Sequence, residues 1–275
     1  ARIFQLGFQA VLLTLGVFLR DFSLLPAQMA LALLSATATQ AFWLWRFDLK
    51  SVGYLSPLIT GLGLALLLRA DNFWVHPLAA LLAISAKFLL RIRGKHLFNP
   101  ANFGVGVALL VLPGAWVSPG QWGSELGIAV WLVALGGLVA QRARRDDAAW
   151  LFLVTFLGLT ATRLFFLGYG AERAVEILLH QALNGALLLF AFFMVSDPMT
   201  LPDRPALRRL HVILVGLFAF VWQFLLYRPN GALWALLCLA PLVPLWDFLW
   251  PGQRHNWRGN RSLQTNLERQ GKIAR

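Results

Sequence analysis

The stretch AFFMVSDPMTLPDR, residues 191–204, joins a wholly apolar run to a polar turn and then to basic residues. The apolar run ends abruptly at Ser196, Asp197 and Pro198, and Thr200 follows. Proline removes a backbone donor and breaks a helix. The stretch therefore predicts either a simple helix end or one wall of a polar pocket at the mouth of a membrane protein.

The composition favours the membrane. Of the 275 residues, 59% are hydrophobic and only 13% are charged. This composition leaves too few polar residues to cover the surface of a soluble domain. Each apolar stretch is close to the roughly 20 residues that a helix needs to cross a bilayer, and only helices and closed barrels satisfy their backbone there. No stretch alternates like a barrel strand. The expected helices are 3–19, 24–46, 52–69, 73–90, 97–113, 123–141, 149–167, 175–195, 209–227 and 231–249.

The basic residues predict the orientation. If all ten stretches cross, one side of the membrane carries only Arg20, Arg69, Arg163, Arg173 and Arg228, and the other 19 of the 24 Lys and Arg residues share the opposite side. Positively charged loops remain in the cytoplasm. We therefore expect a multi-pass protein of a bacterial-type inner membrane, with both termini cytoplasmic, a membrane domain over 1–250 and a basic tail over 251–275. The net charge of +12 then indicates contact with anionic lipid and not with nucleic acid.

Other classes of site have little support in the sequence. Cys238 is the only cysteine, so this chain alone has no disulfide and no cysteine-ligated cluster. The five histidines show no ligand spacing, and we expect no metal site. No glycine pattern of a nucleotide-binding loop occurs.

The chain contains a weak internal repeat. SPLITGLGLALLL (56–68) and HQALNGALLLFAFF (180–193) both place a polar beginning and a glycine before a leucine-rich run. HLFNPANFGVGVALLVLP (96–113) and YRPNGALWALLCLAPLVP (227–244) both place Pro, Asn and Gly before a helix that ends at proline. Five helices per half is an odd number, so the halves are inverted. We expect an all-α polytopic membrane protein with broken helices and pseudo-repeats of about 1–122 and 123–250.

Three motifs in order carry a family resemblance. The first is K-x7-K-x3-N-P-A, formed by Lys87, Lys95 and 99–101; the second is FFMVSDPMT (192–200); the third is CLAPLVPLWDF (238–248). Together they span about 160 residues, 87–248, and this pattern resembles the signatures of the NqrB/RnfD family.

The resemblance implies a membrane subunit of an ion-translocating NADH:quinone or ferredoxin:NAD oxidoreductase, with other membrane and peripheral redox subunits as partners. Such proteins have two inverted five-helix halves, bind flavin and pass electrons across the bilayer. The family's covalent FMN is joined to a threonine in the loop after the fifth helix. The corresponding loop here, GAWVSPGQWGSELG (114–127), contains no threonine. The resemblance then implies a non-covalent flavin, riboflavin or FMN, near the cytoplasmic side, or no flavin.

Candidate cofactor residues lie around the fourth and fifth helices. Lys87, Lys95 and His96 either belong to the positive cytoplasmic loop or hold a phosphate or flavin group. Asn99 suits a helix cap before a proline, whereas Asn102 has no capping role in the sequence. A helix N-terminus is also a place for an anion or a carbonyl.

The second half supplies the remaining candidates. Ser196, Asp197 and Thr200 form the opposite wall of the same pocket if they do more than end a helix. Thr60 and Asn184 come from the two repeated helix beginnings, and they complete the cofactor candidates. Asp247 is the acid of the last motif, and the resemblance makes it an ion-pathway carboxylate; an interfacial position is the alternative.

Three functions remain open at this point. The first is an electron-transfer subunit that holds a flavin. The second is a transporter or channel for a small polar solute or ion, because inverted repeats with broken helices also suit permeation. The third is an assembly protein that kept the fold and lost the flavin. Whether the chain is an enzyme in its own right stays open.

Overall fold

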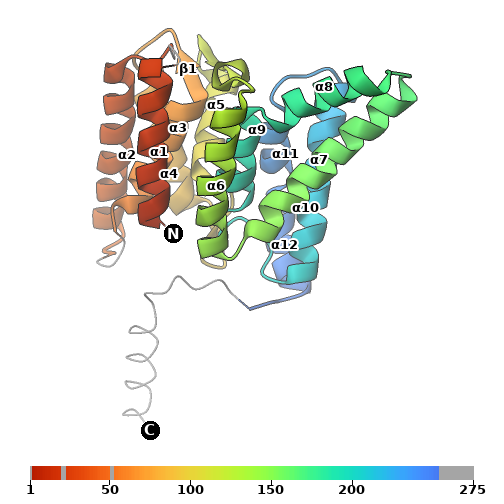
Figure 1. Cartoon of the computed structure of the whole chain (residues 1–275). Coiled ribbons are helices and arrows are strands. Elements are labelled where there is room, and N and C mark those ends of the chain that lie inside the picture. The colour runs from red at the N-terminus through yellow and green to blue at the C-terminus, as the bar shows by residue number, and fades with distance from the viewer. Residues whose placement is uncertain (1, 20–22, 50–52, 254–275) are drawn as a thin grey trace.

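The computed structural model describes residues 2–19, 23–49 and 53–253. Within these residues the chain is a bundle of helices with four very short strands at its ends (Figure 1). Every one of the ten expected stretches contains helix. The chain is an all-α polytopic membrane protein, as its composition indicates.

The first half consists of five helices. They are α1 (Arg2–Leu19), α2 (Pro26–Arg46), α3 (Leu55–Leu67), α4 (Val75–Leu89) and α5 (Pro100–Val111). At one end of the bundle β1 (Leu68–Ala70) pairs antiparallel with β4 (Ala115–Val117), Leu68 opposite Val117. At the other end β2 (Arg91–Ile92) and β3 (Lys95–His96) form a small hairpin.

The second half is more broken. After a 3₁₀ turn, η1 (Pro119–Trp122), come α6 (Leu126–Ala143), α7 (Asp146–Phe166), α8 (Ala171–Ala182) and α9 (Gly185–Leu189). The helix α9 continues directly into a π-helix, η2 (Phe190–Val195), whose residues are all buried. The final elements are α10 (Pro205–Phe220), its π-helical extension η3 (Val221–Leu225), α11 (Gly231–Leu239) and α12 (Leu242–Leu249).

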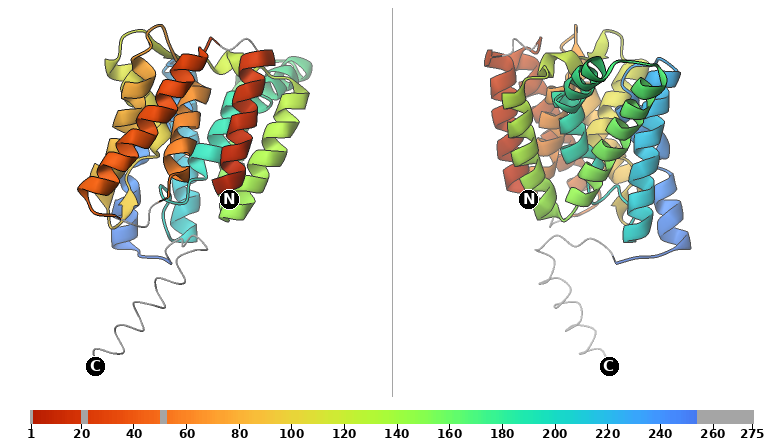
Figure 2. Two further views of the ribbon diagram at one scale, coloured as in Figure 1. Left: turned by 90° about the vertical axis from the view of Figure 1, so that its left-hand side faces the viewer. Right: turned by 45° about the vertical axis from the view of Figure 1, so that its right-hand side comes forward.

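The same pairs of helices pack together in both halves. In the first, α2 packs on α3 and α4, α4 on α5, and α1 on α3; in the second, α7 packs on η2 and α10, α10 on α11, and α6 on α9 and η2. The helices α1 and α6 are neighbours that begin at opposite ends of the bundle (Figures 1 and 2). The halves meet along these two helices and along α5 and α11.

The helices differ in how far they reach. By length and composition α6, α7 and α10 with η3 can each cross a membrane alone. Two bent pairs, α8 with α9–η2 at 49° and α11 with α12 at 41°, are long and apolar enough only if each pair is counted as one broken span. The helices α1, α3, α4 and α5 are apolar but shorter, in part because extended segments replace helix beside α3 and α5. The number of ten complete crossings therefore stays a prediction.

Local sequence explains where several helices begin. Asn99 and Asn184 cap α5 and α9 through their side-chain oxygens, which accept from the N–H groups of Asn102 and Leu187 at 3.1 Å each. Pro205 at the first position starts α10. The beginning of α5 lies next to the loop 196–204, at the same end of the bundle as the β2–β3 hairpin.

Candidate functional site

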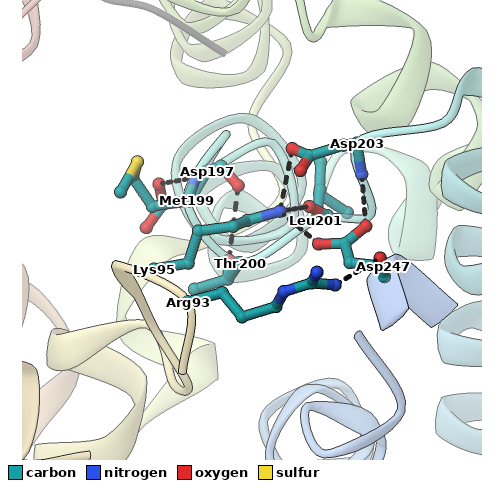
Figure 3. Close-up of polar contacts among 8 residues, drawn as sticks. All are labelled: Arg93, Lys95, Asp197, Met199, Thr200, Leu201, Asp203 and Asp247. Atoms are coloured by element: carbon teal, nitrogen blue, oxygen red, sulfur yellow. Dashed lines mark hydrogen bonds and ion pairs between the residues drawn. The ribbon is translucent and has the colours of Figure 1, made fainter. Parts of the chain in front are cut away.

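Asn99 joins the start of α5 to the loop after η2. Its side-chain Nδ2 donates to Oδ2 of Asp197 at 3.2 Å, across 98 residues of sequence. The other oxygen of Asp197, Oδ1, accepts from the N–H of Met199 at 3.0 Å. The N–H and the hydroxyl of Thr200 both donate to the backbone oxygen of Asp197, at 3.1 and 3.3 Å (Figure 3). The SDPMT stretch is thus a folded turn whose carboxylate faces the first half.

His96 supports the same carboxylate. Its Nε2 lies 3.6 Å from Oδ2 of Asp197, an electrostatic contact slightly longer than a hydrogen bond. Burial raises the pKa of the Asp197 carboxyl, but His96, the Met199 N–H and the charge of Arg2 together outweigh burial and hold the pKa below its usual value. Asp197 is therefore a carboxylate at neutral pH.

A cavity of about 120 Å³ opens beside this turn, several times the ~10–15 Å³ that one water needs. We refer to it as the α1–α3 cavity, because α1 and α3 form much of its wall, together with η2, the end of α6 and the start of α5. Its polar lining comes from Arg2, Gln5, Gln9, Ser56, Thr60, His96, Asn99, Ser196 and Asp197. Its apolar lining includes Leu66, Leu67, Leu189, Phe192, Phe193 and Met194. A site of this kind suits a flat ring with polar groups along one edge.

Lys95 points elsewhere. Its Nζ donates to the backbone oxygen of Leu201 at 2.6 Å, to Oδ2 of Asp247 at 2.8 Å and to Oδ1 of Asp203 at 3.0 Å, so all three ammonium hydrogens have acceptors (Figure 3). Asp247 accepts a further bond, at Oδ1, from the N–H of Asp203, and its backbone oxygen accepts from Arg93. This set, which we call the Lys95 cluster, ties the β2–β3 hairpin to the loop 196–204 and to α12.

The Lys95 cluster borders a second cavity of about 250 Å³, lined also by Val243, Pro244, Pro251 and Gly252. His96 and Met199 line both cavities and separate them. Lys95 and His96 are consecutive residues of β3, and successive side chains of a strand point to opposite faces. That geometry sends Lys95 to the second cavity and lets His96 reach the α1–α3 cavity.

The other candidates have separate positions. Lys87 donates to Oε1 of Gln40 at 2.8 Å and to Oγ of Ser56 at 2.9 Å, just behind the cavity wall. Asn102 donates to the backbone oxygen of Leu233 in α11, and its own Oδ1 is buried without a partner among the described residues. Asn184 is separated from Ser196 by the full length of α9 and η2.

The structure thus brings five predicted residues to one cavity, namely Thr60, His96, Asn99, Ser196 and Asp197. The polar wall from α1 and the start of α3 was not predicted from the sequence; it consists of Arg2, Gln5, Gln9 and Ser56. The three α1 residues follow helical spacing on an otherwise apolar helix, and this was the available signal. Among the residues whose placement is described, no group of three His, Cys, Asp or Glu side chains could hold a metal ion.

Comparison with known proteins agrees with the family resemblance of the second and third motifs. Relatives from two strains of Haemophilus influenzae, PittEE and Rd, are named as the D-type subunit of an ion-translocating oxidoreductase complex; each is 35% identical to this chain over 95 residues. That alignment covers 34% of this chain and 25% of each relative, so the match spans about a quarter of the relatives' length. Residues 117–254, half of the chain, match the model of the NQR2, RnfD, RnfE family, and this range includes the SDPMT turn and Asp247. The chain therefore belongs to the NQR2, RnfD, RnfE family.

Proposed function

We propose that the chain is the electron-transfer subunit of a membrane-bound, ion-translocating oxidoreductase complex, and that its α1–α3 cavity binds a non-covalent flavin, riboflavin or FMN. The observation that carries the proposal is the cavity itself, in which residues of both halves meet around Asp197. Membership of the family and the names of the relatives support the coarser part, a subunit of such a complex.

The residues of the cavity fit an isoalloxazine ring. Phe192, Phe193 and Met194 offer an apolar surface for the ring, and Phe193 is itself stacked on Phe8 with centroids 5.4 Å apart. The amide and imidazole groups of Gln9, Asn99 and His96 supply hydrogen bonds for a polar edge. A flat apolar body with a few convergent polar groups is the usual form of a cofactor site.

A bound flavin supplies one- and two-electron transfer, and the protein's part is to hold and orient it. Asn99 has a double role here, because it caps α5 and also fixes the Asp197 carboxylate at the cavity wall. Asp197 in turn holds the 196–200 turn closed through Met199 and Thr200. The buried apolar lining limits the access of water to the ring.

The end of the bundle that bears the cavity is proposed to face the cytoplasm. The β2–β3 hairpin and the loop 196–204 lie at that end, and they contain basic residues that the positive-inside rule places there. Anionic lipid and the other subunits of the complex are the proposed partners of this region. An ion-pathway role for Asp247 stays a proposal. Its two carboxylate oxygens accept hydrogen bonds from Nζ of Lys95 and from the backbone N–H of Asp203.

The test is the flavin content of the purified protein and its loss on removing one wall residue. Asn99→Ala should lower flavin affinity about ten- to hundredfold, since losing one buried hydrogen-bonding partner costs roughly 1–3 kcal/mol. Asn184→Ala is the matched control, because Asn184 makes the same cap at the same 3.1 Å but lies away from the cavity. Visible flavin absorbance, released by denaturation, is the measurement.

Two results would contradict the proposal. A protein that neither retains nor rebinds flavin would support the transporter or the assembly function in its place. Equal flavin affinity in the wild type, Asn99→Ala and Asn184→Ala would place the flavin outside the α1–α3 cavity.

A further inference from the structure

Gln9 is a buried amide that faces the α1–α3 cavity. It lies in the middle of α1, is 4% exposed and belongs to the cavity lining. Its Oε1 is buried and has no hydrogen-bond partner within the described part of the chain. Such an oxygen is costly to leave unpaired. A half turn of the amide exchanges its oxygen and its nitrogen, so Gln9 can present either an acceptor or a donor to an occupant of the cavity.

Two other buried glutamines have the hydrogen-bond partners that the side-chain oxygen of Gln9 lacks within the described residues. Gln28 accepts from the N–H of Leu25 at 3.1 Å and donates to the backbone oxygen of Ala70 at 2.8 Å. Gln40 accepts from Lys87 at 2.8 Å and donates to the backbone oxygen of Gly53 at 3.2 Å. Both amides use their donor and their acceptor inside the protein, whereas Gln9 presents its amide at a cavity.

A carboxamide presents an N–H donor and a C=O acceptor side by side, whichever way the amide is turned. Its natural partner is another group with a donor next to an acceptor. The pyrimidine part of a flavin has such an edge, because its imide N3–H stands between two carbonyls. A quinone ring offers acceptors alone and would leave Oε1 of Gln9 unpaired.

We propose that Gln9 recognises the imide edge of the flavin and thereby makes the α1–α3 cavity selective for flavin over quinone. This inference rests on the proposed function, because it names the chemical group of the flavin that the cavity recognises. A site built around a hydrogen bond rejects an analogue that lacks the bonding group far more strongly than an apolar site does.

The experiment compares riboflavin with N3-methylriboflavin, in which a methyl group replaces the imide hydrogen. Both are titrated against flavin-depleted protein in detergent, with quenching of flavin fluorescence as the signal. The wild type should bind riboflavin about ten- to hundredfold more tightly than the N3-methyl compound. In Gln9→Leu the affinity for riboflavin should fall by a similar factor, and the two flavins should bind about equally.

Two further variants make the comparison robust. Gln141→Leu makes the same change at an exposed position of α6 outside the cavity lining, and it should keep the preference of the wild type. Gln9→Met keeps the length of the side chain and serves if the leucine variant does not fold, as judged by circular dichroism and elution volume.

The outcomes separate the inference from the proposed function. A wild type that binds riboflavin but does not distinguish the N3-methyl compound overturns the inference and leaves the flavin site standing. A preference that persists in Gln9→Leu or Gln9→Met also overturns it, because the methyl group then meets another part of the wall. A wild type that binds neither flavin overturns the proposed function together with the inference.

Discussion

Replacing Lys95 with methionine removes an ammonium group that lies between two nearly buried carboxylates. The side chains of Lys95, Asp203 and Asp247 are only 9–10% exposed, and the ion pairs measure 3.0 and 2.8 Å. Without Lys95 the two acids and the backbone oxygen of Leu201 face a site that has lost its positive charge. Breaking a buried ion pair from one side costs about 3–5 kcal/mol, mostly because charge remains buried without its partner.

The assay is unfolding of the purified protein in detergent, by heat or by a denaturing detergent. Lys95→Met should lose about 3–5 kcal/mol of unfolding free energy. Arg209→Met is the control, because Arg209 is an exposed basic residue near the same end, and it should stay within about 0.5 kcal/mol of the wild type. Neutralising the acids as well, with Asp203→Asn and Asp247→Asn, should recover much of the loss, since no unpaired charge is then left.

Flavin binding separates stability from function in this series. Lys95 does not line the α1–α3 cavity, so folded Lys95→Met should keep its affinity for flavin. If Lys95→Met is as stable as Arg209→Met, the Lys95 cluster does not hold the loop and α12 together, and the reasoning is refuted.

Three further predictions concern other parts of the chain. The pKa of Asp197 in the folded protein lies below its unfolded value of 3.8. The stability that its carboxylate adds is therefore complete above pH 3.8 and disappears as the pH falls through the folded pKa. The difference in unfolding free energy between the wild type and Asp197→Asn should be widest near neutral pH and should shrink on acidification below 3.8. In Gly185→Ala the new Cβ would come within 2.8 Å of Cβ of Trp122, and overpacking should cost about 1–3 kcal/mol, whereas Gly158→Ala has open space and should not destabilise. A cysteine introduced at Gly120, in a cysteine-free background, should react with a membrane-impermeant thiol reagent from outside intact cells, and reaction only from the cytoplasmic side would reverse the proposed orientation.

The helices could be predicted from the sequence because a membrane demands long apolar runs. The breaks within them were harder to place. Asn184 and Pro241 mark the two bends, yet only packing decides that the chain turns there by 49° and 41°. The π-helices η2 and η3 could not be predicted, because an unbroken apolar run looks the same whatever hydrogen bonds its backbone makes.

The site could be predicted in part, through motifs that belong to the same end of the bundle. His96, Asn99 and Asp197 do meet, although about 100 residues separate the two walls. Lys95 could not be told from His96 by sequence, because their different directions depend on the strand β3. The helical spacing of Arg2, Gln5 and Gln9 marks one face of α1, but only the contacts of α1 with α3 and α6 decide that this face points inward, so Gln9 was missed.

The Lys95 cluster also has a consequence for how the protein is made. Asp203 and Asp247 lie 108 and 152 residues after Lys95, so a ribosome working at about 5–20 residues per second needs roughly 8–30 s to supply the last partner. Until Asp203 has been made the ammonium group has neither carboxylate, and until Asp247 has been made it has only one, so it is best kept in water at the membrane surface. The Lys95 cluster is complete only once α12, which contains Asp247, has been synthesised, so the last helix also completes the attachment of the β2–β3 hairpin at this end of the bundle.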